Sequence, residues 1–220
     1  MLFSRLNAEN DTIVEMLASA LRRDIAFGVL RPDEKLKIAA LRQRYGGSNH
    51  SMRETLRMLT AQGMVEATNQ RGFRVTSAND EDLRDILLMR LELEGLGLAR
   101  SMARGDVDWE ASVIAARHRT ARADADVQAN PDDVTALKWD EACRVFATTL
   151  SSACGSPRLI DMIGRFYDQS RRFCLARLRE GAIDFKGRAE RQDGLRDAII
   201  ERNESQALGL LQDEIRTEMT

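Results

Sequence analysis

Three polar side chains recur at intervals of four residues in one segment: Asn49, Arg53 and Arg57. Residues four apart share one face of an α-helix, so an amide and two guanidiniums would line a single exposed face. Guanidiniums bind phosphate or guanine and an asparagine amide pairs with adenine, so this chemistry suits the groove of double-stranded DNA. Apolar residues spaced four and three apart define the opposite, buried face: Met52, Leu56 and Leu59.

A short helix and a tight turn precede this segment. Residues 38–45 are predicted to be the first helix of a helix-turn-helix, which crosses the DNA backbone while the second helix enters the groove. The turn is Gly46-Gly47-Ser48, because glycine reaches backbone angles that other residues avoid. Two serines could cap the second helix, since Ser48 ends the turn and Ser51 to Glu54 matches a capping box. Another helix is expected to begin at the capping box of Thr12 to Glu15.

Two strands are predicted after the second helix, over residues 64–68 and 72–76. A β-ribbon in this position is a wing, and an arginine at its tip can enter the minor groove. The alternative is an ordinary exposed hairpin. Base edges would be read by Asn49, His50 and Arg53, and the neighbouring Arg57 shares their face. Phosphates would be held by Arg42, Arg44, Ser48 and Ser51. The wing tip would place Arg71 and Gly72 in the minor groove.

Charge is unevenly distributed along the 220 residues, whose net charge is −2. Residues 1–78 carry 12 Lys/Arg and 8 Asp/Glu, a balance of +4, and residues 79–220 carry 21 and 27, a balance of −6. A basic DNA-binding domain joined to an acidic sensing domain would show this asymmetry. No apolar run of about 18 residues exists, so no membrane span is predicted. The three cysteines lack CxxC spacing and fit free thiols in a reducing cytoplasm, which is the predicted location.

The remainder of the chain predicts helices only, at roughly 80–104, 108–129, 132–153, 157–180, 188–203 and 205–218. The expected fold class is therefore mainly α, with an N-terminal winged helix-turn-helix over 1–78 and a C-terminal all-α helical bundle over 79–220. No nucleophile elbow, P-loop or glycine-rich dinucleotide loop is present, so we do not expect an enzyme. A winged helix can also serve protein contacts alone. That alternative is disfavoured by the basic face, since such contacts more often use apolar or aromatic anchors.

The N-terminal motif resembles the winged helix of GntR-family transcriptional regulators, and the rest resembles the FCD ligand-binding domain of the FadR subfamily. Together the resemblances span about residues 10–216. The segments that carry them are Gly47 to Leu56, Gly63, Gln70 to Val75, Arg90 to Glu94, Phe146 and Gly155 to Leu159. Three shorter segments most resemble the carbon-starvation-induced (CsiR-like) branch: Asp33 to Leu36, Asn69 to Gly72 and Cys154 to Ser156. The resemblance implies a homodimeric repressor of a palindromic operator, controlled by a small organic acid. Asn49 replaces the family's usual arginine, which favours adenine over guanine.

The resemblance also implies a metal position that this sequence does not keep. Many FCD domains bind a metal through an acidic or polar residue, a histidine one turn later and two further histidines. By spacing, these positions are Cys143, Ala147, Gln192 and Glu214. Alanine has no donor atom and a neutral glutamine is a poor transition-metal ligand, so we expect no metal and no cofactor.

Without a metal, fixed guanidiniums are the natural partners of a carboxylate effector, because they bind carboxylates bidentately. Asp140 would hold one of these arginines in place. For each arginine the alternative is a salt bridge with an acidic residue of the same domain. The predicted effector-binding residues are Arg90, Asp140, Arg144, Arg171 and Arg172.

Overall fold

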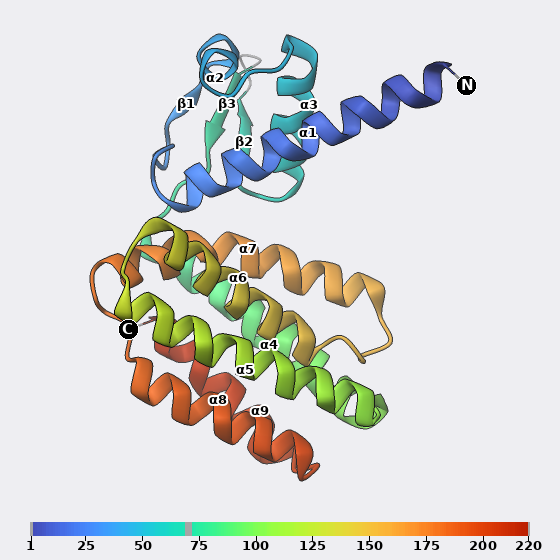
Figure 1. Ribbon diagram of the computed structural model, residues 1–220, viewed down its shortest axis with the longest axis vertical. Coiled ribbons are helices and arrows are strands. Elements are labelled where there is room, and N and C mark those ends of the chain that lie inside the picture. Colours follow the sequence, from blue (N-terminus) through green and yellow to red (C-terminus); the bar gives the residue numbers. More distant parts are fainter. Residues whose placement is uncertain (1, 69–71, 220) are drawn as a thin grey trace. The chain divides into compact units, whose positions relative to one another are not determined.

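The computed structural model describes residues 2–68 and 72–219, and the chain divides into two compact units, Met1–Asn79 and Asp80–Thr220. We call them the head and the body. The division falls one residue after the boundary expected from the sequence. The predicted fold class is confirmed, since the head is a winged helix-turn-helix and the described body is entirely helical (Figure 1). No described helix is long and apolar enough to cross a membrane.

The described residues of the head form three helices and three short strands. In chain order they are α1 (Leu2–Ala26), β1 (Lys35–Leu36), α2 (Ile38–Tyr45), α3 (Asn49–Ala61), β2 (Val65–Thr68) and β3 (Gly72–Val75). The apolar stripe predicted for α3 is buried as expected, and Leu21 of α1 joins it in the core of the head. This burial fixes the opposite face of α3 toward solvent.

The sheet of the head contains one strand more than the sequence predicted. The strand order is β1-β3-β2, and both neighbours run antiparallel to β3. Lys35 pairs with Arg74 and Val65 pairs with Val75. The predicted wing therefore exists with its two strands, and β1 extends it on the other side. The wing tip, residues 69–71 including Arg71, lies outside the described residues.

Helix α1 begins at Leu2, so the start predicted at the Thr12 capping box is wrong. Residues 2–11 contain neither glycine nor proline, and nothing in them interrupts a helix. A capping-box pattern is local and occurs by chance inside helices. The helix therefore runs through it.

The described residues of the body form six α-helices and a turn of 3-10 helix. They are α4 (Asp80–Arg104), α5 (Val107–Ala129), α6 (Asp133–Leu150), α7 (Pro157–Arg179), α8 (Phe185–Ile200), α9 (Glu204–Arg216) and the turn Thr217–Met219. Helix α5 packs on α6, α8 packs on α9, and α4 packs on both α7 and α9 (Figure 1). Fully buried side chains such as Leu87, Trp139 and Ile199 fill the space between them.

Candidate functional site

The start of α3 is fixed by a reciprocal pair of serine hydrogen bonds. Ser48 Oγ accepts from the Ser51 backbone N–H at 3.0 Å, and Ser51 Oγ accepts from the Ser48 N–H at 2.9 Å. Ser48 is therefore the N-cap, which settles the ambiguity of the sequence. Ser51 is only 2% exposed. Contrary to our expectation, Ser51 is thus a helix-capping residue and not a candidate phosphate ligand.

The face of α3 that was predicted to read DNA is open to solvent. Asn49, His50, Arg53 and Arg57 are all exposed. Arg57 forms an ion pair with Glu54 on the same helix, which partly neutralises it. Arg53 has no hydrogen-bond or ion-pair partner in the part of the chain that the structure describes. Its five N–H donors are consequently available to a ligand.

Arg42 of α2 reaches across the turn to α3. Its Nη1 donates to Asn49 Oδ1 at 3.2 Å and its Nε donates to the Gly47 carbonyl at 3.2 Å. The Asn49 oxygen is therefore already an acceptor, and only the amide N–H groups are unengaged. Reading adenine bidentately uses both the oxygen and the nitrogen of the amide, so it would require Arg42 to release Asn49.

Arg44 is tethered within the head and remains half exposed. Its guanidinium lies 3.0 Å from Asp24 and 5.2 Å from the centre of the Tyr45 ring. The Tyr45 hydroxyl donates to the same aspartate at 2.6 Å, and burial raises the pKa of Tyr45, so the hydroxyl stays protonated. These contacts hold Arg44 at the surface beside the turn. At the wing, the Gly72 N–H donates to the Thr68 hydroxyl at 3.2 Å.

Arg90 does not sit where an effector could reach it. It is 4% exposed, and its guanidinium pairs with Glu94 at 2.6 Å and with Glu218 at 2.8 Å. It also donates to the Ser170 hydroxyl at 3.1 Å and lies 4.7 Å from the centre of the Tyr167 ring. These contacts argue against the predicted effector-binding role of Arg90. Its positive charge is already balanced by two carboxylates, so Arg90 is a structural residue of the body.

Three other predicted effector residues meet in one ion-pair cluster between α6 and α7. Arg171 Nε donates to Asp140 at 2.7 Å. Asp168 lies between the two arginines and forms ion pairs with Arg171 at 3.4 Å and with Arg144 at 3.0 Å. Asp140 is 1% exposed, and burial raises its pKa to about 6 despite the arginine beside it. As predicted, Asp140 holds an arginine. The cluster nevertheless lies outside the pocket described below, and so does Arg172, which lies over the Phe173 ring.

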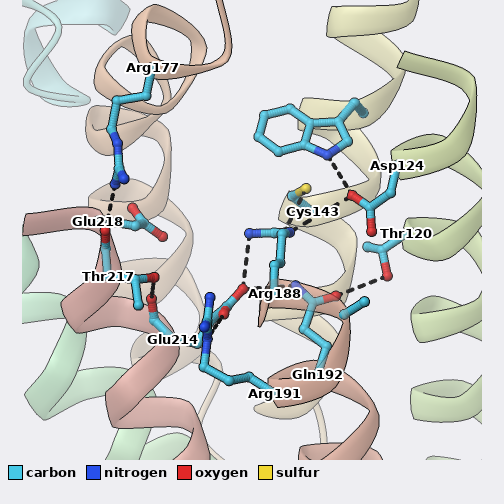
Figure 2. Close-up of polar contacts among 12 residues, drawn as sticks. Thr120, Asp124, Cys143, Arg177, Arg188, Arg191, Gln192, Glu214, Thr217 and Glu218 are labelled. Carbon is cyan, nitrogen blue, oxygen red and sulfur yellow. Dashed lines mark hydrogen bonds and ion pairs between the residues drawn. The ribbon is translucent and has the colours of Figure 1, made fainter. Parts of the chain in front are cut away.

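Three of the four positions that the resemblance identified as a metal site, Cys143, Gln192 and Glu214, do come together, but around an arginine. Figure 2 shows the guanidinium of Arg188 between Cys143 and Glu214. Its Nη2 lies 3.0 Å from Cys143 Sγ and its Nη1 lies 3.0 Å from Glu214 Oε1. Gln192 donates to the same Glu214 oxygen at 3.0 Å. A cation among the donors repels a metal ion, so this set of residues does not fit one.

Two further buried side chains, Trp139 and Asp124, lie beside Arg188. Trp139 Nε1 donates to Asp124 Oδ1 at 2.7 Å, and that oxygen is 3.9 Å from Arg188 Nε. Burial raises the pKa of Asp124 and raises the pKa of Cys143 to about 12, so the thiol stays neutral. Arg188 Nε and Asp124 Oδ2 are buried, and neither has a hydrogen-bond partner among the described residues. Buried polar atoms are nearly always satisfied by protein, water or ligand.

Arg188 also lines a pocket of about 210 Å³ in the body. The other lining residues include Arg177 and Arg191, and the apolar part of the lining includes Leu83, Phe173 and Ile183. None of the five predicted effector residues lines it. These three arginines were not among the predicted residues, because other arginines were selected as the partners of the effector. The signal was present, since Arg188 precedes Gln192 by four residues and so shares its face of α8.

Comparison with known proteins matches both units. Residues 13–75 match the domain described as "Bacterial regulatory proteins, gntR family", and residues 85–216 match the "FCD domain". The HTH-type transcriptional repressor GlaR of Escherichia coli (strain K12) is 30% identical over 200 residues, covering 90% of both chains. An uncharacterized HTH-type transcriptional regulator, BphR of Paraburkholderia xenovorans (strain LB400), is 34% identical over 162 residues, covering 74% of this chain and 66% of its own.

Solved structures share the fold at lower identity. E. coli McbR/YncC superposes with a TM-score of 0.72 at 17% identity, covering 93% of both chains. A putative transcriptional regulator GntR from Rhodococcus sp. RHA1 superposes with a TM-score of 0.71 at 20% identity, covering 92% of this chain and 93% of its own.

Proposed function

The chain belongs to the GntR family of bacterial regulatory proteins and carries an FCD domain, and from this premise we propose that it is a repressor whose operator affinity is set by a small organic acid. The head binds double-stranded DNA as part of a homodimer, on a palindromic site. The body binds the acid, and this binding changes the affinity of the head for DNA. The assignment to the carbon-starvation-induced branch stays a prediction, as does a cytoplasmic location.

The observation that carries the DNA-binding role is the exposed polar face of α3. Arg53 is solvent-facing and uncommitted, and it stands one turn from Asn49, so both can reach base edges if α3 enters a major groove. Arg42, Arg44 and Ser48 lie around the turn that precedes α3, where they would contact phosphates. Arg71 and Gly72 would enter the minor groove from the wing.

The proposed effector is a small carboxylate. The support is chemical, because the pocket in the body presents guanidiniums and is smaller than the roughly 300 Å³ at which sites for drug-sized ligands begin. A ligand of few carbon atoms with an anionic group matches both features. For control of DNA binding, the acid must bind the two states of the protein with different affinity.

Replacing Arg53 with alanine tests the recognition helix. We expect Arg53→Ala to weaken operator binding by about tenfold or more, because a bidentate base contact contributes about 1–3 kcal/mol and a homodimer makes it twice. The affinity is measured by fluorescence anisotropy on a duplex that the wild-type protein selects from random sequence. Circular dichroism confirms that the variant is folded.

Arg31→Ala is the matched control, since Arg31 is an exposed arginine of the head outside the helix-turn-helix. Wild-type affinity of Arg53→Ala would show that α3 does not read the operator. A protein that binds no DNA even at low salt would favour the alternative, a winged helix used for protein contacts. Specific binding should instead weaken steeply as salt rises.

A further inference from the structure

Arg188 lies among the residues at which the family resemblance would place a metal. Its guanidinium contacts Cys143 and Glu214, two of the four metal positions, and Gln192 at the third position bonds to the same glutamate. The fourth, Ala147, contributes no donor. Arg188 is therefore a permanent positive charge, held by the fold, where related domains use an exchangeable cation.

The hydrogen bonds of Arg188 are incomplete. A guanidinium has five N–H donors. In the described part of the chain Arg188 contacts one thiol, one glutamate and, at 3.9 Å, one aspartate, and its guanidinium lies 5.4 Å from the centre of the Trp139 ring, which accepts no conventional hydrogen bond. The thiol is neutral and a weak acceptor. Arg188 Nε is buried without a hydrogen bond. A buried charged donor without a hydrogen-bond partner is destabilising, so binding of a further acceptor at Arg188 is favourable.

The guanidiniums of the pocket are also only partly neutralised by carboxylates. Arg188 and Arg191 share the single carboxylate of Glu214, at 3.0 and 2.7 Å. Arg177 donates to two backbone carbonyls, those of Thr217 and Ala182, and to no carboxylate among the described residues.

The two acidic residues that line the pocket are already engaged. Glu218 pairs with Arg90 at 2.8 Å, and Asp184 caps α8 by accepting from the Gly187 N–H at 3.0 Å. An anion that entered the pocket would therefore meet three guanidiniums and one exchangeable carboxylate.

We propose that Arg188 and Arg191 bind the carboxylate of a small organic acid in place of a metal, and that this acid displaces Glu214 from them. The exchange replaces one carboxylate by another, so the two arginines remain paired and hydrogen-bonded throughout. The desolvation of the guanidiniums is already part of the ligand-free fold. In the absence of ligand, the carboxylate of Glu214 thus occupies the position that the ligand carboxylate would take.

The displacement has a direct path to the first helix of the body. Glu214 lies near the end of α9, one turn before Glu218, whose carboxylate pairs with the buried Arg90 of α4. Helix α4 begins at Asp80, immediately after the head. A shift at the end of α9 therefore changes a contact of the helix that continues from the head. This step rests on the proposed function, whereas the binding site does not.

Calorimetry on the full chain, with EDTA present, tests the site. The probes are unbranched mono- and dicarboxylates from acetate to adipate, with sulfate as the inorganic anion. We expect at least one carboxylate to bind wild-type protein, and Arg188→Gln to weaken that binding by about tenfold or more because a charge-assisted bidentate pair is lost. Arg191→Gln should weaken it less. Arg165→Gln, an exposed arginine of α7 paired with Asp161, is the control and should not change it.

Glu214→Gln provides the sharper measurement. Because a neutral amide competes poorly for guanidiniums, this variant should bind the same carboxylate about fivefold or more tightly than the wild type. The carboxylate should also raise its melting temperature by more than it raises that of the wild type. If Arg188→Gln does not fold, Arg188→Lys keeps the charge, loses the bidentate geometry and should bind more weakly.

Three outcomes would overturn the site: no carboxylate binds, sulfate binds as well as every carboxylate, or Glu214→Gln binds no more tightly. The proposed function fails in a different way. Carboxylate binding that depends on Arg188 but leaves operator affinity unchanged would disprove control of the repressor and retain the site. If a carboxylate controls operator binding and its affinity does not depend on Arg188, the proposed function is retained and the site at Arg188 is disproved.

Discussion

One arginine decides what chemistry the body can support. The guanidinium of Arg188 lies between a thiol and a carboxylate that could otherwise be metal ligands, and its positive charge excludes a second cation. Buried charges of this kind normally need a counter-ion, which Glu214 supplies. Within the described residues, no group of three His, Cys, Asp or Glu side chains is placed to hold a metal.

A metal-binding experiment follows from this placement. In the double variant Ala147→His, Gln192→His, two imidazoles are added beside Cys143 and Glu214, which completes a donor set suited to zinc. We expect the double variant to bind no zinc while Arg188 is present. Adding Arg188→Ala should create a site that retains about one zinc ion per chain, because removing the guanidinium frees both the position and the ligands. Equilibrium dialysis followed by atomic absorption measures this. Zinc retained by the double variant itself would show that Arg188 does not occupy the metal's place.

At the level of elements, the position of α3 depends on how the helix starts. The Ser48–Ser51 capping box satisfies two backbone N–H groups at the junction of turn and helix. Ser48→Ala should destabilise α3 by about 1 kcal/mol, as the loss of an N-cap hydroxyl does. Hydrogen exchange of the α3 amides should therefore quicken about fivefold.

Thr60→Ala is the control for this experiment. It removes a hydroxyl from the same helix, where the hydroxyl bonds back to the Leu56 carbonyl at 2.8 Å and caps nothing. The exchange of the α3 amides should change little in this variant. Equal effects of the two substitutions would mean that the cap does not limit the stability of α3.

The elements that the sequence predicted well are those with local signals. The body helices begin beside the residues that mark breaks in the pattern, since Asp106, Asp132, Ser156 and Asn203 each cap the helix that follows. Strand β1 has no such signal, because its two residues are a strand only through pairing with β3, 37 residues away in the case of Leu36 and Phe73. Pairing of this kind depends on the tertiary fold.

The candidate site shows the same limit. The family resemblance placed Cys143, Gln192 and Glu214 at one site, and they do lie together, but it could not show which arginine fills the space between them. Arg90 and Arg171 were both predicted to bind the effector, and each is paired with a buried acidic residue. Which of many arginines remains available depends on the pairing of all the acidic side chains around it. Sequence periodicity does not contain that information.

At the scale of the whole molecule, the two units must be coupled for the body to regulate the head. The coupling is a free energy, so it acts in both directions. If the carboxylate changes operator affinity by a given factor, operator DNA must change carboxylate affinity by the same factor, which is typically about 5–150-fold. Anisotropy of labelled operator and calorimetry of the carboxylate measure the two factors independently.

The ion pair between Glu218 and Arg90 is the contact through which we expect this coupling to pass. Glu218→Gln leaves Arg188, Arg191 and Glu214 in place but removes one negative charge from the lining of the pocket, so carboxylate affinity in the absence of DNA should be equal to or higher than that of the wild type. The coupling factor should fall toward one, because the 3-10 turn that follows α9 then contacts α4 through one charge fewer. Asp213→Asn, which removes an exposed ion pair with Arg216 on the same helix, should leave both quantities unchanged. A Glu218→Gln variant that keeps the full coupling factor would place the connection between the units elsewhere.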